Sequence, residues 1–256
     1  MKILLTNEAG CFHPGIIALA KELSKDHRVC IVAPLTQQVG SGHSLTVDQR
    51  PLHAQQWFVL DRVKIWSVDG TPCDCVALAL DKLLLDKPDL IISGIDPVNN
   101  RGNMIYTSGV VSAAIEGAIQ DIKSIALSAT ILHEKKERAY RRVAKFVARK
   151  LEFLAKQIPD YGVLNVNFPE KFKAKNLMPT ALTDGLLDNE YEIEVNPFGS
   201  TFAWLKSPLM EFGMDAYEQK GDLYWLKQGY ITMTPLKLDL LKGDALTALQ
   251  KAGIKL

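Results

Sequence analysis

The sequence has almost no excess of charge of either sign. Its 30 Lys and Arg residues nearly balance 29 Asp and Glu residues, which leaves a formal net charge of +1. Proteins that bind duplex nucleic acid usually carry a basic excess or a basic stripe. The basic residues between 135 and 142 are expected to form the solvent-exposed face of a helix, so we predict no nucleic-acid polymer as a partner.

Long hydrophobic runs are also missing near the start of the chain. The first apolar stretch extends only from Ile3 to Leu5. That stretch is too short for a signal peptide or a membrane-spanning helix. We therefore expect a cytoplasmic protein with no membrane partner.

Cysteine is scarce, and its spacing does not match a zinc site. The chain has four cysteines, of which Cys73 and Cys75 are separated by one residue. No second C-x-C pair and no His pair accompanies them, as a zinc site would require. The cysteines are therefore expected to be buried free thiols.

The sequence does contain a regular alternation of short apolar runs and amphipathic segments. Such alternation is typical of right-handed βαβ units. We predict an α/β fold, with a Rossmann-like three-layer core and a mainly parallel sheet. The predicted strands are residues 2–6, 28–33, 63–68, 89–93, 124–128 and 163–166, and the predicted helices begin at Pro14, span 72–85 with Thr71 as N-cap, follow Ser108, and span 134–157.

The pattern changes in the C-terminal part of the chain. Turn signals occur at 184–185 and 196–199, and no helical pattern of useful length lies between about 170 and 220. We predict a C-terminal antiparallel hairpin extension attached to the core. The expected organisation is a single domain with a core at 1–165, the extension at 166–236 and a tail at 237–256. Protruding hairpins often pair between subunits, so a homodimer or homotetramer is expected.

Three polar loops follow predicted strands, at 7–14, 34–47 and 94–107. In a parallel sheet, ligands bind beyond the carboxyl ends of the strands. Glu8 and Asp96 lie on two of these loops and could share a divalent cation, since hard cations prefer oxygen ligands. The alternative is that both are surface acids near a helix terminus.

The same loops also contain two histidines, and the third loop leads into the start of a predicted helix. His13 and His43 could act as an acid or a base near neutral pH, or could make only turn or core hydrogen bonds. Ser108 and Gly109 begin a predicted helix, where free N–H groups and the helix dipole favour an anion. Arg101 could supply a planar cation for a phosphate. The alternative is an ordinary N-cap serine beside a surface arginine.

The order and spacing of these motifs resemble those of the SurE family of nucleotidases over nearly the whole chain. The opening strand followed by Pro14-Gly15 resembles the start of that family. Further matching motifs are Ala33-Pro34 with Gly40 and residues 42–46, Gly70-Thr71-Pro72, residues 87–90 and 93–95, Asn100, Gly102, Ser108-Gly109, Glu116-Gly117, residues 164–167, Gly229-Tyr230 and residues 234–236.

The resemblance implies a metal-dependent phosphatase of 5′- and 3′-nucleoside monophosphates, with a Rossmann-like core and a hairpin that helps to build dimers or tetramers. It implies Mg or Mn held by two adjacent aspartates, a serine and an asparagine, and a Ser-Gly-Thr turn that binds phosphate. In this sequence those positions are Glu8 and Ala9, Val39, Asp96, and a turn that ends in Val110. The differences are concentrated in the expected site.

Three hypotheses follow for the site. In the first, Glu8 and Asp96 hold Mg or Mn, His43 or water fills gaps in the ligand set, and a nucleotide or other small phosphate ester is hydrolysed. The phosphate would contact Asn100, Arg101, Ser108 and Gly109.

In the second hypothesis, the chain catalyses a metal-independent reaction on a similar ligand. Glu8 would be the base or nucleophile, Arg101 would replace the charge of the cation, and Cys11 lies in the same loop as a further nucleophile. In the third, the chain binds a nucleotide or phosphate without turnover, since Ala9 and Val39 cannot coordinate a cation.

Overall fold

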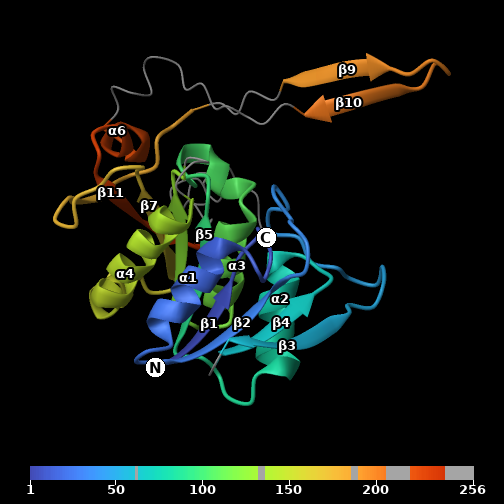
Figure 1. Ribbon diagram of the computed structural model, residues 1–256. Coiled ribbons are helices and arrows are strands. Elements are labelled where there is room, and N and C mark those ends of the chain that lie inside the picture. The colour runs from blue at the N-terminus through green and yellow to red at the C-terminus, as the bar shows by residue number, and fades with distance from the viewer. Residues whose placement is uncertain (61–62, 132–135, 186–189, 206–219, 240–256) are drawn as a thin grey trace, which may run out of the picture.

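A computed structural model describes residues 1–60, 63–131, 136–185, 190–205 and 220–239. Figure 1 shows a twisted sheet with helices on both faces and a hairpin that projects from the body. The sheet has nine strands in the order β3-β4-β2-β1-β5-β6-β7-β11-β8. Their bounds are β1 Lys2–Thr6, β2 Arg28–Pro34, β3 Ala54–Leu60, β4 Val63–Val68, β5 Leu90–Asp96, β6 Ser124–Ala129, β7 Gly162–Phe168, β8 Leu177–Pro179 and β11 Ile231–Lys237.

The strand pairing confirms the predicted mainly parallel α/β sheet. β1 pairs in parallel with β2 and β5, and the parallel ladder continues through β4 on one side and through β6 and β7 on the other. The edge strand β3 runs antiparallel to β4, and β11 runs antiparallel to β7, while β8 at the other edge pairs in parallel with β11. β3 was not among the predicted strands, and the last strand, β11, continues to Lys237.

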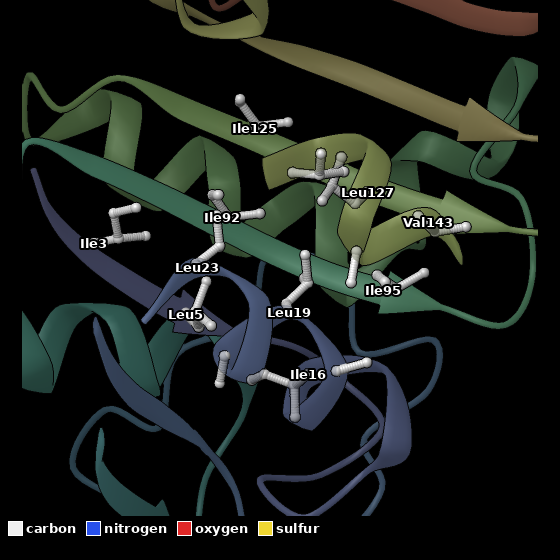
Figure 2. Close-up of a cluster of buried hydrophobic side chains, with 14 of the residues drawn as sticks. Ile3, Leu5, Ile16, Leu19, Leu23, Ile92, Ile95, Ile125, Leu127 and Val143 are labelled. Carbon is white, nitrogen blue, oxygen red and sulfur yellow. The ribbon is translucent and has the colours of Figure 1, made fainter. Parts of the chain in front are cut away.

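Helices cover both faces of the sheet because successive side chains of the strands point to opposite sides. Ile3 and Leu5 of β1 pack with the α1 and α4 helices, whereas Leu4 packs with α2 and α3. Figure 2 shows the first of these cores, with Ile16, Leu19 and Leu23 of α1 against the sheet. The helices are α1 Pro14–Leu23, α2 Pro72–Leu78 continued by a π-helical turn at Ala79–Leu83, the 3-10 helix η2 Gly102–Tyr106, α3 Gly109–Ile119, α4 Lys136–Ala155 and α6 Asp222–Lys227.

The parallel pairing brings the three polar loops to one edge. β1, β2 and β5 end at Thr6, Pro34 and Asp96, and Thr6 lies in register with Ser93 of β5. The loops at 7–14, 34–47 and 94–107 therefore leave the same end of the sheet, as the sequence predicts.

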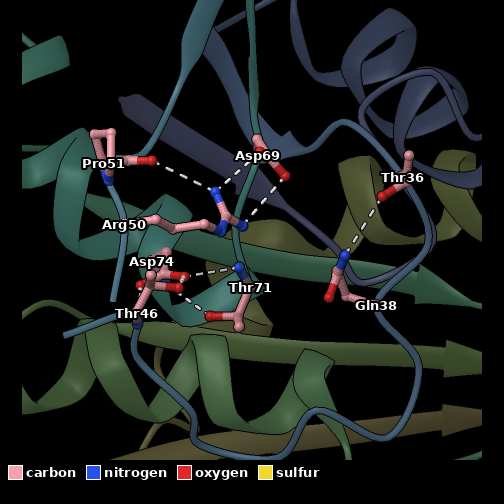
Figure 3. A network of polar contacts seen from close by, with 8 residues as sticks. All are labelled: Thr36, Gln38, Thr46, Arg50, Pro51, Asp69, Thr71 and Asp74. Carbon is pink, nitrogen blue, oxygen red and sulfur yellow. Dashed lines mark hydrogen bonds and ion pairs between the residues drawn. The ribbon is translucent and has the colours of Figure 1, made fainter. Parts of the chain in front are cut away.

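Residues at the N-terminus of α2 form hydrogen bonds with the segment that follows β2 (Figure 3). Asp74 accepts hydrogen bonds from the backbone N–H and the hydroxyl of Thr46, at 2.8 and 2.7 Å. It also accepts one from the N–H of Thr71, while Thr71 caps α2 as predicted. Arg50 pairs with Asp69 at 2.9 Å. These contacts tie the second polar loop to the body.

The C-terminal part returns to the sheet after forming a hairpin. β9 (Tyr191–Val195) and β10 (Thr201–Leu205) pair antiparallel around a turn at 196–199, as predicted, and project away from the core (Figure 1). β8 before the hairpin and β11 after it both lie in the main sheet. The division near residue 166 stays a prediction, and the predicted tail lies outside the described residues beyond 239.

Among the described residues, no helix has both the length and the hydropathy needed to cross a membrane. The cytoplasmic location and the absence of a nucleic-acid partner stay predictions.

Candidate functional site

Two acidic side chains are buried together at the polar edge of the sheet. Glu8, in the loop after β1, and Asp96, the last residue of β5, are each only 4% exposed. The two carboxyl groups interact with each other, since each affects the pKa of the other. The prediction that these two loops bring Glu8 and Asp96 together therefore holds, and the alternative of two surface acids does not.

Burial disfavours the charged form of both acids. It raises the pKa of Glu8, an effect opposed by hydrogen bonds from Asp96 and from the N–H groups of Gly109 and Val110. Burial, followed by the negative charge of Glu8, raises the pKa of Asp96 well above its usual value. The pair therefore holds a proton more readily than two separate exposed acids would.

The first turn of α3 lies against this acid pair. The N–H of Gly109 donates to Glu8 Oε2 at 2.8 Å, and Ser108 Oγ accepts from the N–H of Val111 at 3.1 Å. Ser108 is therefore an N-cap, as one of the two interpretations predicts. The carboxylate of Glu8 occupies the end of the helix where an anion is expected to bind.

Ser41 is a site residue that the sequence analysis missed. Its Oγ is buried and has no hydrogen-bond partner in the part of the chain that the structure describes. A Cβ atom placed on Gly109 would lie 2.8 Å from both Ser41 Oγ and Glu8 Oε2, so the three residues converge on one point. Val39, to which the resemblance assigns the serine position, is instead 64% exposed. The sequence feature that could have identified Ser41 is its place between two glycines, Gly40 and Gly42, in the second polar loop.

The two histidines make hydrogen bonds away from the acid pair. His43 Nε2 lies 2.8 Å from Glu116 Oε2 on α3, and this bond attaches the second loop to that helix. His13 caps α1 by accepting from the N–H of Gly15 at 3.2 Å. Its ring packs edge-on against Tyr140, and burial, with a smaller effect of a nearby lysine, lowers its pKa. His13 therefore has the turn role that was the alternative to acid–base chemistry, while the catalytic role assigned to His43 stays a prediction.

Asn100 is fixed by its backbone beside Asp96. Its carbonyl accepts from Nδ2 of Asn165 at 2.7 Å and of Asn167 at 3.0 Å, and its N–H donates to Ser128 Oγ at 3.2 Å. Its side chain lies near enough to Asp96 to oppose the rise in that residue's pKa. Its Nδ2 is buried and makes no standard hydrogen bond with the described residues. These contacts hold the third loop rigidly against β6 and β7.

The remaining candidates differ in their environment. Arg101 is half-buried and directly precedes η2 in the third loop. Cys11 is fully buried, and burial raises the pKa of its thiol to about 11. A thiol with that pKa is protonated near neutral pH and is a poor nucleophile. The hypothesis of a reactive Cys11 is therefore wrong. Cys73 and Cys75 are buried free thiols as predicted, and Cys30 is partly buried.

The acid pair has no third acidic, histidine or cysteine side chain beside it in the described ranges, where no group of at least three such residues could hold a metal ion. Any cation here would depend on Glu8 and Asp96 together with hydroxyl and amide oxygens. Hard cations such as Mg²⁺ accept such ligands and keep several waters.

Comparison with known proteins gives a consistent result. The model of the family described as survival protein SurE matches residues 3–189. The 5′-nucleotidase SurE of Thermosipho africanus (strain TCF52B) is 36% identical over 256 residues, covering 98% of this chain and 97% of the relative. That of Clostridium botulinum (strain Loch Maree / Type A3) is 39% identical over 243 residues and covers 94% of each chain. The crystal structure of the SurE protein from Aquifex aeolicus superposes with a TM-score of 0.79 at 33% identity, covering 99% of this chain and 100% of that one.

Proposed function

The chain belongs to the SurE family, and on that premise we propose that it is a metal-dependent phosphatase of nucleoside monophosphates or a related small phosphate ester. The observation that carries the proposal is the buried pair Glu8 and Asp96 beside the first turn of α3. Two neighbouring buried acids ionise together only when a cation compensates them. The relatives' name, 5′-nucleotidase, supports the substrate class.

The residues present fit a hard divalent cation, so Mg or Mn is the proposed cofactor. Glu8 and Asp96 would supply carboxylate oxygens, and the unpartnered Oγ of Ser41 would take the place of the serine ligand. The side-chain amide of Asn100 would add a further oxygen. Mg²⁺ and Mn²⁺ prefer such oxygen donors.

Two positions contribute nothing to this set. The side chain of Ala9 has no atom that could bind a cation, and neither has the exposed side chain of Val39. Because Val39 points into solvent, it does not place an apolar group in the cation site. The proposed site is therefore altered and weaker than a complete ligand set, but it is not blocked by Val39.

Residues of the chain would position the substrate. A bound cation would offset charge on the phosphate oxygens. The hydroxyl of Ser108 donates to a phosphate oxygen, and Arg101 adds a planar cation from the same loop. His43 fixes the second loop by its bond to Glu116 and is proposed as a positioning residue.

One observation favours a second candidate function, which is binding without turnover. The N–H of Gly109 is already bonded to Glu8, so a phosphate at this helix end competes with the chain's own carboxylate. If Glu8 does not release this N–H, a phosphate ester binds only weakly and is not hydrolysed.

Phosphate release distinguishes these functions. The substrates are a panel of nucleoside monophosphates and p-nitrophenyl phosphate, each assayed with Mn²⁺ and with a chelator. We expect release that requires Mn²⁺. Release that survives chelation would replace the proposal by a metal-independent reaction, and saturable ligand binding without release would replace it by the binding function.

We also propose a homodimer or homotetramer in which a second copy covers the β9–β10 hairpin. One face of this hairpin is apolar, because Tyr191, Ile193 and Val195 lie across from Leu205, Ala203 and Thr201. Tyr191, Ile193, Val195 and Leu205 are 57%, 66%, 64% and 48% exposed in the single chain. A contiguous exposed apolar face on a strand pair is typical of an interface.

Ile193→Glu is expected to shift the protein to a smaller species in sedimentation equilibrium. Its side chain is at the centre of the apolar face, where an unpaired charge is costly to bury in an interface. Leu85→Glu is the matched control, since Leu85 is 95% exposed, follows the π-helical turn at Ala79–Leu83 and lies outside the hairpin. A wild-type monomer, or an equal shift in both variants, would contradict the assignment of the hairpin as the interface.

A further inference from the structure

A cavity of about 470 Å³ opens at the polar edge of the sheet, on the side of β6 and β7. Its volume is within the range of about 300–1,000 Å³ that is usual for small-molecule sites. The walls come from the end of β6 and residues 130–131, the N-terminal half of α4 and the segment 169–172 that follows β7. The lining residues that carry the argument are Thr130, Ile131, Arg138, Arg142, Lys171 and Phe172.

The cavity has a positive lining. Arg138, Arg142 and Lys171 contribute three positive charges and Glu170 one negative charge, which leaves a difference of +2. Within the ranges that the structure describes, none of the three cations forms a salt bridge. On the same helix, Arg141 pairs with Glu137 instead. The basic residues of α4 are exposed, as the sequence predicts, and Arg138 and Arg142 also line the cavity.

Arg142 is held in position by uncharged groups. Its guanidinium donates to the carbonyl of Phe172 and stacks over the ring of the same residue, with 4.2 Å between the guanidinium carbon and the ring centroid. A guanidinium has five N–H donors, so several remain available to a ligand. Stacking restricts the side chain before binding, which lowers the entropy lost when an anion is bound.

The cavity wall is hydrogen-bonded to the loop that carries Asp96. Thr130 Oγ1 donates to Asn99 Oδ1 at 3.0 Å, and Asn99 Nδ2 donates to the carbonyl of Phe168 at 3.3 Å. The N–H of Ile131 also donates to the carbonyl of Pro97. A ligand in the cavity therefore contacts a wall that supports the third loop.

We propose that this cavity binds a phosphate dianion at a site separate from the first turn of α3. Two arginines and a lysine suit phosphate, because guanidinium groups form paired charge-assisted bonds to its oxygens. The dianion has two possible sources, a free phosphate-bearing ligand or a second phosphate of the substrate itself. The binding step requires no turnover, so it is testable whether or not the proposed phosphatase activity is correct.

Calorimetric titration of inorganic phosphate into the full-length protein, with chelator and at physiological ionic strength, tests the site. We expect the double variant Arg138→Gln, Lys171→Gln to bind phosphate at least about tenfold more weakly than wild type, since two charged donors are lost. Arg142 is left intact because of its packing on Phe172. The matched control, Lys145→Gln with Arg149→Gln, removes the same charge from exposed positions of α4 and should bind as wild type does.

Equal phosphate affinity in wild type and the cavity variant, or an equal loss in the control, would overturn the proposal. The two sources are then separated by kinetics with a nucleoside monophosphate and a nucleoside bisphosphate. A KM that rises in the cavity variant for the bisphosphate alone identifies the site as a substrate subsite. Unchanged KM values with lost phosphate binding identify it as a site for a separate ligand.

Discussion

Glu8→Gln is expected to lower Mn²⁺-dependent phosphate release by about 100-fold or more, the scale typical of losing a group that acts directly in the chemistry. Glutamine keeps the length of the side chain, can accept from the N–H of Gly109 and can donate to Asp96. It removes only the negative charge that the cation requires. The measurement is the initial rate of release under saturating Mn²⁺, with folding checked by circular dichroism.

Two further variants show whether the loss of activity comes from the missing charge at Glu8. Glu152→Gln removes an exposed carboxylate of α4 and should leave the rate unchanged. Glu8→Asp keeps the charge but shortens the side chain by one methylene, so it should retain activity and weaken the contact with Gly109. A rate in Glu8→Gln within a few-fold of wild type would contradict a role for Glu8 in the site.

Gly94→Ala is expected to destabilise the fold by about 3 kcal/mol or more, the sum of a close steric overlap and a strained backbone. Gly94 lies in β5 with φ +130°, and a Cβ atom there would lie 2.2 Å from the carbonyl oxygen of Leu127 on the neighbouring strand. Because Gly94 precedes Asp96 by two residues, the change also displaces the acid pair. Urea denaturation measures the free energy of unfolding.

Gly40→Ala is the control for backbone strain without overlap. Gly40 has φ +75°, and a Cβ atom there would meet nothing within 4 Å. Its expected cost is about 1–2 kcal/mol, the usual penalty for a left-handed non-glycine residue. A Gly94→Ala protein no less stable than Gly40→Ala would show that the contact between β5 and β6 at this point is not tight.

Much of the fold follows from local pattern. The period of two in β1 assigns Ile3 and Leu5 to one helical layer and Leu4 to the other, and the structure places them so. The convergence of Glu8 and Asp96 also follows, because both come at the ends of strands in a parallel sheet. A motif such as Thr71 before Pro72 is enough to locate the start of α2.

The remaining features of the site depend on contacts between distant residues. His43 and Glu116 are 73 residues apart, and the bond between Asn165 and the carbonyl of Asn100 spans 65 residues. No periodicity within a segment encodes such a pair. The direction of β11, antiparallel to β7, likewise depends on how the chain returns after the hairpin.

The substitution at position 8 also has a consequence that residue type alone does not reveal. A carboxylate is retained, so the charge needed for a cation is present in the sequence. The contact with the N–H of Gly109 becomes evident only from the position of α3. The same residue therefore supports a cation site and competes with phosphate for the helix end.

Calorimetric titration of Mn²⁺ into wild type and Glu8→Gln, in two buffers of different ionisation enthalpy, tests the central claim that Glu8 and Asp96 hold a divalent cation. We predict saturable binding to wild type with release of a proton, because burial raises the pKa of both acids and a bound cation favours their charged forms. Affinity should fall at least about tenfold in Glu8→Gln. Absence of binding to wild type, or binding that Glu8→Gln leaves unchanged, would contradict the account.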